Sequence, residues 1–204
     1  MSSAERAIVK AADQAKDLAL LCPNCASLVG ETSRTSSDEQ ILFACSSCYT
    51  KLRCRDGVWN ALSPAREAYY ARFVANYEKV RAAEGRGSRN AEFYLALPYE
   101  DVTHRNESQW AIRARSFVCL DRQVLPLLEE SGGDKLDVLD LGAGNGWLSY
   151  RLALRGHRPV AVDLLDNAFD GLGAAKHYQA RLPNLFPRFR ADLHSLPFGD
   201  RQFD

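Results

Sequence analysis

The sequence predicts an α/β fold in its last third, preceded by a cysteine-rich module and a helical connector. Residues 134–204 alternate strand-like apolar runs with a glycine-rich loop and an amphipathic run. Residues 21–62 hold five of the six cysteines, and residues 63–133 carry helix start and stop signals. Residues 1–20 are alanine-rich and charged, which predicts a helix or a tail.

The composition is that of an ordinary globular chain. Of the 204 residues, 26 are Lys or Arg and 26 are Asp or Glu, so the formal net charge is zero. A nonspecific nucleic-acid binder would show a basic excess. No apolar run reaches the length of a membrane span, and the first residues lack the apolar core of a signal peptide. We therefore expect a cytoplasmic protein without a membrane partner, whose cysteines are reduced or bound to metal.

Two CxxC pairs predict a structural zinc site. Cys22 and Cys25 form the first pair, and Cys45 and Cys48 follow after nineteen intervening residues. Four thiolates at this spacing can surround zinc tetrahedrally, which leaves no open position for catalysis. Cys54, just beyond the second pair, is a weaker candidate that could replace Cys48 as a ligand.

Short local signals define the rest of the cysteine module and its end. Asp56-Gly57 predicts a hairpin turn between two short strands. The leftover Cys119 falls on the apolar side of a predicted helix, so we expect it in the core.

The connector reads as two helices. Ser63 is a candidate N-cap, Pro64 suits the first helical position, and Gly85 can close the helix. An apolar stripe at helical spacing is expected to pack on the core, and it comprises Tyr70, Phe73, Tyr77 and Val80. After a loop with about one helical turn, a second helix is expected from Glu107 to Leu125, with Pro126 ending or kinking it.

The glycine-rich loop lies between a strand and a helix. Residues 136–141 read as a buried strand, residues 147–155 as a helix, and residues 158–165 as a second strand that contains Asp163. This arrangement binds nucleotide-like ligands at the carboxyl edge of parallel sheets. The Lys of a triphosphate-binding loop is absent, and Trp147 stands where a dinucleotide-binding loop needs Gly or Ala.

What remains is Asp-x-Gly-x-Gly-x-Gly over residues 140–146, which resembles motif I of class I S-adenosylmethionine-dependent methyltransferases. The segment ADLHSLPFGDRQFD is similar to their methyltransferase type 11, or ubiquinone-biosynthesis-like, branch. Residues 21–62 resemble the zinc-binding modules of 23S ribosomal RNA guanine methyltransferases and of methyltransferase activator subunits. The resemblance implies a Rossmann-like sheet with strand order 3-2-1-4-5-7-6, of which this chain reaches strand 3 and the start of strand 4.

Two expectations follow from that implied sheet. A longer protein is expected to supply the remaining strands. The first strand of the sheet would meanwhile have a free edge, and through this edge association with a partner is expected.

The resemblance also implies roles for particular residues. The glycines would let the backbone approach the methionine part of the cofactor, Asp140 would hold its amino group, and Asp163 would bind the ribose hydroxyls. Leu164 would lie against the adenine, Asp192 would accept from the adenine amino group, and the Leu193 amide would face the ring. The implied cofactor-binding set is Asp140, Gly142, Ala143, Gly144, Gly146, Asp163, Leu164, Asp192 and Leu193.

The expected activity is methyl transfer to an acceptor that is either RNA or a small molecule. The alternative function is a noncatalytic binding or assembly module. No catalytic residue is assigned. Candidates for the rim of the acceptor site are Tyr77, Arg81, Tyr94, Tyr99, Trp110 and Arg113.

Overall fold

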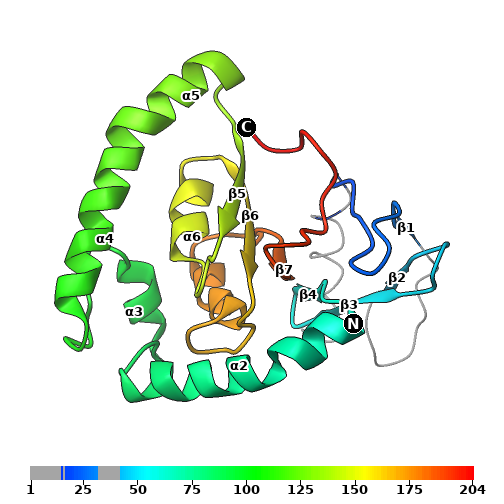
Figure 1. The fold of residues 1–204 in the computed structure, drawn as a ribbon. Coiled ribbons are helices and arrows are strands. Elements are labelled where there is room, and N and C mark those ends of the chain that lie inside the picture. The colour runs from blue at the N-terminus through cyan, green and yellow to red at the C-terminus, as the bar shows by residue number, and fades with distance from the viewer. Residues whose placement is uncertain (1–14, 16, 32–41) are drawn as a thin grey trace.

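A computed structural model describes residues 15, 17–31 and 42–204, so most of the N-terminal segment lies outside the described residues. In the described part, one mixed sheet of seven strands has the order β1-β2-β3-β4-β7-β6-β5 (Figure 1). The strands are β1 (Gly30–Glu31), β2 (Leu42–Ala44), β3 (Lys51–Arg55), β4 (Val58–Asn60), β5 (Asp137–Leu141), β6 (Arg158–Asp163) and β7 (Arg188–Arg190).

The three C-terminal strands form the predicted parallel sheet. β5 pairs with β6 in parallel, and β6 pairs with β7 in parallel. This order matches the first three strands of the expected Rossmann-like sheet and confirms the α/β fold class. Helix α6 (Trp147–Leu154) connects β5 to β6, and the 3-10 helix η2 (Leu172–Ala180) lies between β6 and β7. Among the described strands, β5 pairs only with β6. On its other edge, the Asp204 amide donates to the Asp137 carbonyl at 2.9 Å, and the Asp204 carboxylate accepts from the Asp137 amide at 2.8 Å.

The cysteine module extends the same sheet. β1 to β4 are antiparallel, and the turn between β3 and β4 is the predicted hairpin, with φ of 50° at Asp56 and 75° at Gly57. β4 then pairs in parallel with β7. The buried Arg188 side chain of β7 donates to the backbone oxygen of Asp56, which links the hairpin turn to the parallel sheet.

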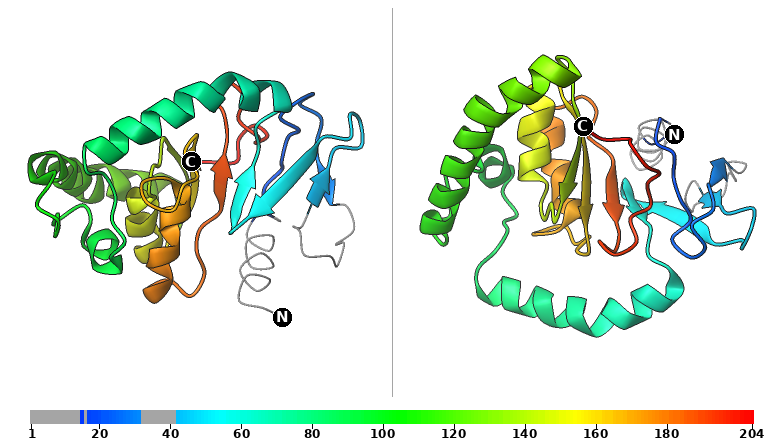
Figure 2. Two further views of the ribbon diagram at one scale, coloured as in Figure 1. Left: turned by 90° about the horizontal axis from the view of Figure 1, so that it is seen from below. Right: turned by 45° about the horizontal axis from the view of Figure 1, so that its top comes forward.

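Helix α2 (Pro64–Ala83) begins at the predicted cap. The hydroxyl of Ser63 accepts a hydrogen bond from the Arg66 amide at 3.3 Å, and Gly85 follows the helix with φ of 68°. The expectation that its apolar stripe packs on the core is wrong, because no α2 residue is buried and Phe73 and Val80 are about half exposed. The helix crosses the carboxyl ends of the parallel strands instead of covering a sheet face (Figures 1 and 2).

The second connector helix is longer than expected. After the short α3 (Ala91–Ala96), α4 (Glu107–Cys119) continues through a π-helical turn η1 (Leu120–Val124) into α5 (Leu125–Gly132) (Figure 1). Pro126 does not end the helix. It occupies the first turn of α5, and the Leu125 amide bonds to the Leu120 carbonyl across the wider turn, which accommodates the missing proline donor.

Two large apolar cores cover the two faces of the sheet, and a third, smaller one holds Leu125, Leu136 and Leu152. One large core joins the cysteine module to the parallel strands, and in it the Trp59 ring lies 4.9 Å from Phe43 and 6.4 Å from Phe189. The other large core fills the space between the sheet and helices α3, α4, α6 and η2, and includes Tyr94, Tyr150 and Tyr178. No helix in the described ranges is both long enough and apolar enough to cross a membrane.

Candidate functional site

The carboxyl ends of the three parallel strands bring the predicted residues to one edge of the sheet. β5 leads into the glycine loop (residues 142–146), β6 ends at Asp163, and Asp192 follows β7 by two residues. Since β5, β6 and β7 are parallel neighbours, these three positions lie side by side. This edge is where open α/β sheets bind their ligands.

The glycine loop has a left-handed backbone at each of its glycines. The φ angles of Gly142, Gly144 and Gly146 are 73°, 55° and 76°. A Cβ at Gly142 would meet no atom within 4 Å, whereas a Cβ at Gly146 would lie 3.0 Å from the Phe186 ring. The backbone conformation therefore favours glycine at all three positions. Packing adds a second requirement at Gly146, and the space beside Gly142 is open.

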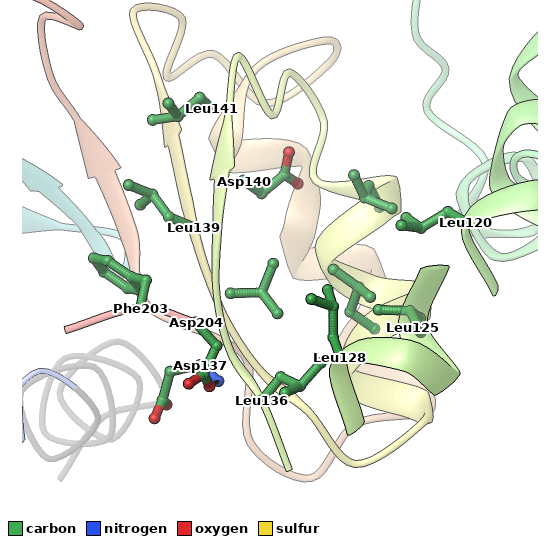
Figure 3. A pocket seen from close by; sticks show the side chains of 13 residues that line it. Leu120, Leu125, Leu128, Leu136, Asp137, Leu139, Asp140, Leu141, Phe203 and Asp204 are labelled. Carbon is green, nitrogen blue, oxygen red and sulfur yellow. Dashed lines mark hydrogen bonds between the residues drawn. The ribbon is translucent and has the colours of Figure 1, made fainter. Parts of the chain in front are cut away.

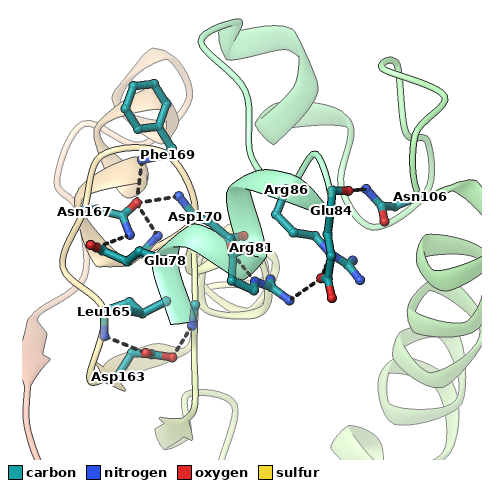
Figure 4. A network of polar contacts seen from close by, with 12 residues as sticks. Glu78, Arg81, Glu84, Arg86, Asn106, Asp163, Leu165, Asn167, Phe169 and Asp170 are labelled. Atoms are coloured by element: carbon teal, nitrogen blue, oxygen red, sulfur yellow. Dashed lines mark hydrogen bonds and ion pairs between the residues drawn. The ribbon is translucent and has the colours of Figure 1, made fainter. Parts of the chain in front are cut away.

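Asp163 ties the end of β6 to this loop. One carboxylate oxygen accepts from the Gly144 amide and the other from the Leu165 amide, both at 2.8 Å (Figure 4). Burial raises the pKa of Asp163, although the two amides oppose that shift. Each oxygen keeps further lone-pair capacity, so the carboxylate can also accept from the hydroxyls of a ligand. Leu164 beside it is half-buried.

Asp140 is buried and anchors the first turn of α6. One of its oxygens accepts from the Ser149 amide at 3.2 Å and from the Ser149 hydroxyl at 2.8 Å. Burial raises the pKa of Asp140. Ser149 itself is fully buried, and the sequence interpretation missed it as a partner. Its position three residues after Gly146, in the first turn of the helix, was the available signal.

Asp192 is bound by side chains of α2. It accepts from the Arg66 Nε at 2.5 Å, from the Tyr70 hydroxyl at 3.1 Å and from the His194 amide at 3.0 Å. Burial acts to raise the pKa of Asp192, but these hydrogen bonds and the Arg66 charge lower it overall. Leu193 is exposed, and its amide makes no hydrogen bond within the described ranges.

A polar face of α2 continues along this edge, and Figure 4 shows the part of it that includes Glu78 and Arg81. Glu67 pairs with Arg190 at 2.7 Å, and Glu78 accepts from Asn167 at 2.9 Å. Arg81 pairs with Asp170 at 2.5 Å. Together with Arg66 and Tyr70, these side chains repeat at helical spacing on the half-exposed side of α2. This polar pattern is present in the sequence. Tyr70, a member of the apolar stripe expected to pack on the core, lies on this polar side and bonds to Asp192.

The six candidates for the rim of the acceptor site do not form one surface. Tyr94 is fully buried, and its hydroxyl contacts the Phe169 carbonyl at 2.5 Å. Trp110 is also buried, 6.1 Å from the ring of Trp147. The four that remain at least partly accessible are Tyr77, Arg81, Tyr99 and Arg113.

A separate apolar hollow of about 570 Å³ runs along the outer edge of β5 (Figure 3). Residues of β5, of the α4–α5 helix and of α6 line it, and Phe203 and Asp204 close one side. Leu141 at the end of β5 is about half exposed. This hollow lies along the outer side of β5, and Asp140, one of the predicted cofactor-binding residues, is part of its lining.

The four cysteines of the two CxxC pairs meet in one cluster. The Cys22 and Cys48 sulfurs are 3.5 Å apart, as are those of Cys25 and Cys45, and all four lie within 4.8 Å of one another. Four sulfurs placed about 2.3 Å from one tetrahedral ion are about 3.8 Å apart. The cluster therefore has the dimensions of a four-cysteine metal site. A hydrogen bond with the Thr50 side chain is the largest cause that lowers the pKa of Cys48 to about 5.

The two remaining cysteines lie elsewhere. Cys54 is fully buried in the core of the module, its pKa is raised by burial to about 12, and it is not part of the cluster. Cys48 is therefore the fourth member, as the spacing predicts. Cys119 is exposed, so the expectation that it packs in the core is wrong. Within α4 the buried residues Trp110 and Phe117 share one face, and Cys119, two residues after Phe117, falls on the opposite face.

Comparison with known proteins gives one informative match. No family model matches the chain. A malonyl-[acyl-carrier protein] O-methyltransferase from Erwinia pyrifoliae is 35% identical over 72 residues, which are 35% of this chain and 25% of the relative. The chain thus spans about a quarter of the length of the curated relative that it matches. The match supports a methyltransferase in general.

Proposed function

We propose that this chain is an S-adenosylmethionine-dependent methyltransferase with a zinc-ribbon module. The observation that carries the proposal is the hydrogen bond between Asp163 and the Gly144 amide, beside an open space at Gly142. It places a carboxylate with spare acceptor capacity next to a glycine loop at the ligand-binding edge of a parallel sheet. A noncatalytic binding module remains the alternative.

The residues present fit the two ends of that cofactor. In this proposal the glycine loop accommodates the methionine part, and Asp163 accepts hydrogen bonds from the ribose hydroxyls. Leu164 offers apolar surface to the adenine, and the Leu193 amide faces the ring. The adenine amino group would take the place of the Tyr70 hydroxyl, which makes the longest of the three hydrogen bonds to Asp192 described above. The cofactor supplies a methyl group on a positively charged sulfur, and the protein orients it and excludes water.

Zinc is the metal that we propose for the cysteine cluster. Four sulfur ligands at tetrahedral separations are typical of structural zinc, and a closed four-cysteine site leaves no position for a substrate. Because thiolates must stay reduced to bind metal, the site agrees with the cytoplasmic location that we also propose.

Two classes of methyl acceptor, a small molecule and RNA, remain within the proposal, and a different observation supports each. The relative, by its name, methylates an oxygen of a malonyl group carried by a protein. An RNA acceptor is supported by β3, whose exposed side presents Lys51, Arg53 and Arg55 on the cysteine module.

Calorimetry and a transfer assay test the function in order. We expect the full-length protein to bind S-adenosylmethionine, and no binding at millimolar ligand would remove the enzyme proposal. Radiolabelled methyl transfer is then measured with two acceptors, total RNA and malonyl-acyl-carrier protein, in separate reactions. Label in one acceptor alone selects that class. Label in neither, with cofactor bound, favours the noncatalytic alternative or a different small acceptor.

A further inference from the structure

Three arginines gather beside the glycine loop without a full set of acidic partners. Arg81 ends α2, Arg86 lies in the loop after it, and Arg113 belongs to α4. Arg81 pairs with Asp170, and the Arg86 side chain, only 8% exposed, pairs with Glu84 at 3.1 Å (Figure 4). The third arginine has only an aromatic contact, because the Arg113 guanidinium lies 4.8 Å from the Trp110 ring centre.

Two lines of contact connect this arginine cluster, defined as Arg81, Arg86 and Arg113, to the loop. Asp170 pairs with Arg81 through its carboxylate. Its backbone carbonyl oxygen would lie 3.6 Å from a Cβ placed on Gly144. Trp110, under Arg113, packs edge-on against Trp147, the first residue of α6 after the loop. The cluster is therefore linked to Gly144 through Asp170 and to the start of α6 through Trp110 and Trp147.

The charges in this cluster do not balance. Three guanidinium groups face two carboxylates, those of Asp170 and Glu84. Arg113 is half-buried, and its side chain makes no hydrogen bond or ion pair with any residue that the structure describes. Burial lowers the pKa of Arg113, and the charges of Arg86 and Arg81 lower it further. A partly desolvated guanidinium with five unused donors is costly unless an anion pairs with it.

The shape of the unpaired group indicates the kind of anion. A guanidinium presents two parallel N–H groups that match the two oxygens of a carboxylate. The Arg113 guanidinium is held beside the Trp110 ring by a cation–π contact, with its carbon 4.8 Å from the ring centre.

We propose that Arg113, supported by Arg81 and Arg86, binds a carboxylate next to the reacting end of the methyl donor. The inference rests on the proposed function for the identity of the ligand. That carboxylate belongs to the acceptor or to the methionine part of the donor itself, and the two sources share the same chemistry.

The test uses Arg113→Gln, Arg113→Lys and a matched control, Arg115→Gln, in which an exposed arginine of the same helix is replaced. Circular dichroism melting first checks that each variant folds. Calorimetry then measures the binding of S-adenosylmethionine and of its decarboxylated analogue. Separately, malonate is titrated with and without saturating S-adenosylhomocysteine, and tryptophan fluorescence is followed, since Trp110 lies under the guanidinium.

Each result has a defined meaning. If the donor carries the carboxylate, Arg113→Gln lowers the affinity for S-adenosylmethionine by about tenfold or more and leaves the affinity for the decarboxylated analogue unchanged. If the acceptor carries the carboxylate, the same variant abolishes malonate binding to the protein saturated with S-adenosylhomocysteine, and the affinity for S-adenosylmethionine does not change. Arg113→Lys should recover only part of either effect, because it keeps the charge and loses the fork.

Arg115→Gln should resemble the wild type throughout. Equal binding of donor, analogue and malonate by the wild type and Arg113→Gln would overturn the inference. Failure of the wild type to bind either cofactor form would instead contradict the methyltransferase proposal. Malonate alone would still test the arginine cluster.

Discussion

At the scale of single residues, the carboxyl edge of the sheet holds three kinds of feature. These are glycines with left-handed backbone, a buried carboxylate, and a half-buried carboxylate that can accept further hydrogen bonds. The glycine loop adopts left-handed backbone at Gly142, Gly144 and Gly146, and Asp163 holds the middle of the loop through one amide. Asp140 is turned inward to Ser149. The two acids differ in accessibility, because Asp140 is buried and Asp163 is half-buried at the open side of the loop.

Asp163→Asn is expected to lower the affinity for S-adenosylmethionine by about tenfold to a hundredfold. The asparagine amide carries no charge, and its NH2 group replaces an acceptor that faces either a backbone N–H or the ligand. This replacement reduces the free energy of cofactor binding by about 1.5–3 kcal/mol. Calorimetry measures the change. Asp166→Asn, at an exposed position three residues further on, is the control and should bind normally. Unchanged affinity in Asp163→Asn would refute the ribose role.

Gly146→Ala should destabilise the fold more than Gly156→Ala does. Both residues have positive φ, 76° and 93°, but only a Cβ at Gly146 meets the Phe186 ring, at 3.0 Å. Backbone strain of about 1 kcal/mol is common to both variants, and overpacking at Gly146 adds about 1–3 kcal/mol. Urea unfolding of the two proteins gives the difference. Equal losses would show that the ring moves aside without cost.

At the scale of elements, α2 and the cysteine module are both attached to the sheet near the carboxyl ends of its parallel strands. α2 attaches to the edge by polar pairs at Asp192, Arg190, Asn167 and Asp170. The module attaches through β4, which pairs with β7 and is followed directly by the cap of α2. The cysteine module and α2 are therefore joined to the same strand, β7, and to each other through β4.

The attachment of α2 should depend on pH through Asp192. Its pKa is lowered from 3.8 in the folded state, so the charged carboxylate stabilises the fold above that pH, and this stabilisation is lost as the pH falls through the folded pKa. Asp192→Asn should therefore be less stable than the wild type near neutral pH, and the gap should close in acid. Urea unfolding along a pH series measures it, with the exposed Asp200→Asn as control. A gap that stays constant with pH would contradict the role of the charge.

Loss of the metal should loosen more than the cysteine module. We expect about one zinc per chain by metal analysis, and Cys45→Ser should lose it. Because β4 pairs with β7, amide exchange should also accelerate in β7. The exposed Cys119→Ser lies outside the cluster and should keep both the metal and the protection. Full zinc content in Cys45→Ser would count against the four-cysteine ligand set.

At the scale of the whole molecule, β5 is the edge strand of the parallel half of the sheet. It adjoins the apolar hollow of about 570 Å³, with Leu141 half exposed at its end (Figure 3). Asp204 occupies the outward backbone groups of Asp137, and beyond that residue the edge presents backbone groups to another strand. The opposite end of the parallel half is closed by β4, so the two sides of the sheet differ in how they meet their surroundings.

We predict concentration-dependent self-association through this edge. Sedimentation equilibrium across the micromolar range should detect it, and Leu141→Lys should weaken it by placing a charge at the edge. Leu28→Lys, at an exposed position in the cysteine module, is the control and should associate as the wild type does. A wild type that stays monomeric throughout, or equal effects of both variants, would contradict the prediction.

Much of the local structure follows from sequence signals that act over a few residues. The cap at Ser63, the turn at Asp56-Gly57 and the glycine loop between two apolar strands each depend on neighbours along the chain. The CxxC spacing likewise determined which four cysteines could meet. The order of the parallel strands was available only through the resemblance of the motifs to a known family.

Only the tertiary structure decided how the pieces meet. The pairing of β4 with β7, the exposure of the aromatic stripe on α2 and the continuation of α4 through Pro126 depend on residues distant in sequence or on a wider helical turn. The same is true of Arg113 beside Arg81 and Arg86. Periodicity reports which side of a helix is apolar, but burial depends on whether another element covers that side. For α2, polar partners at the sheet edge hold the opposite face, so its aromatic side remains exposed.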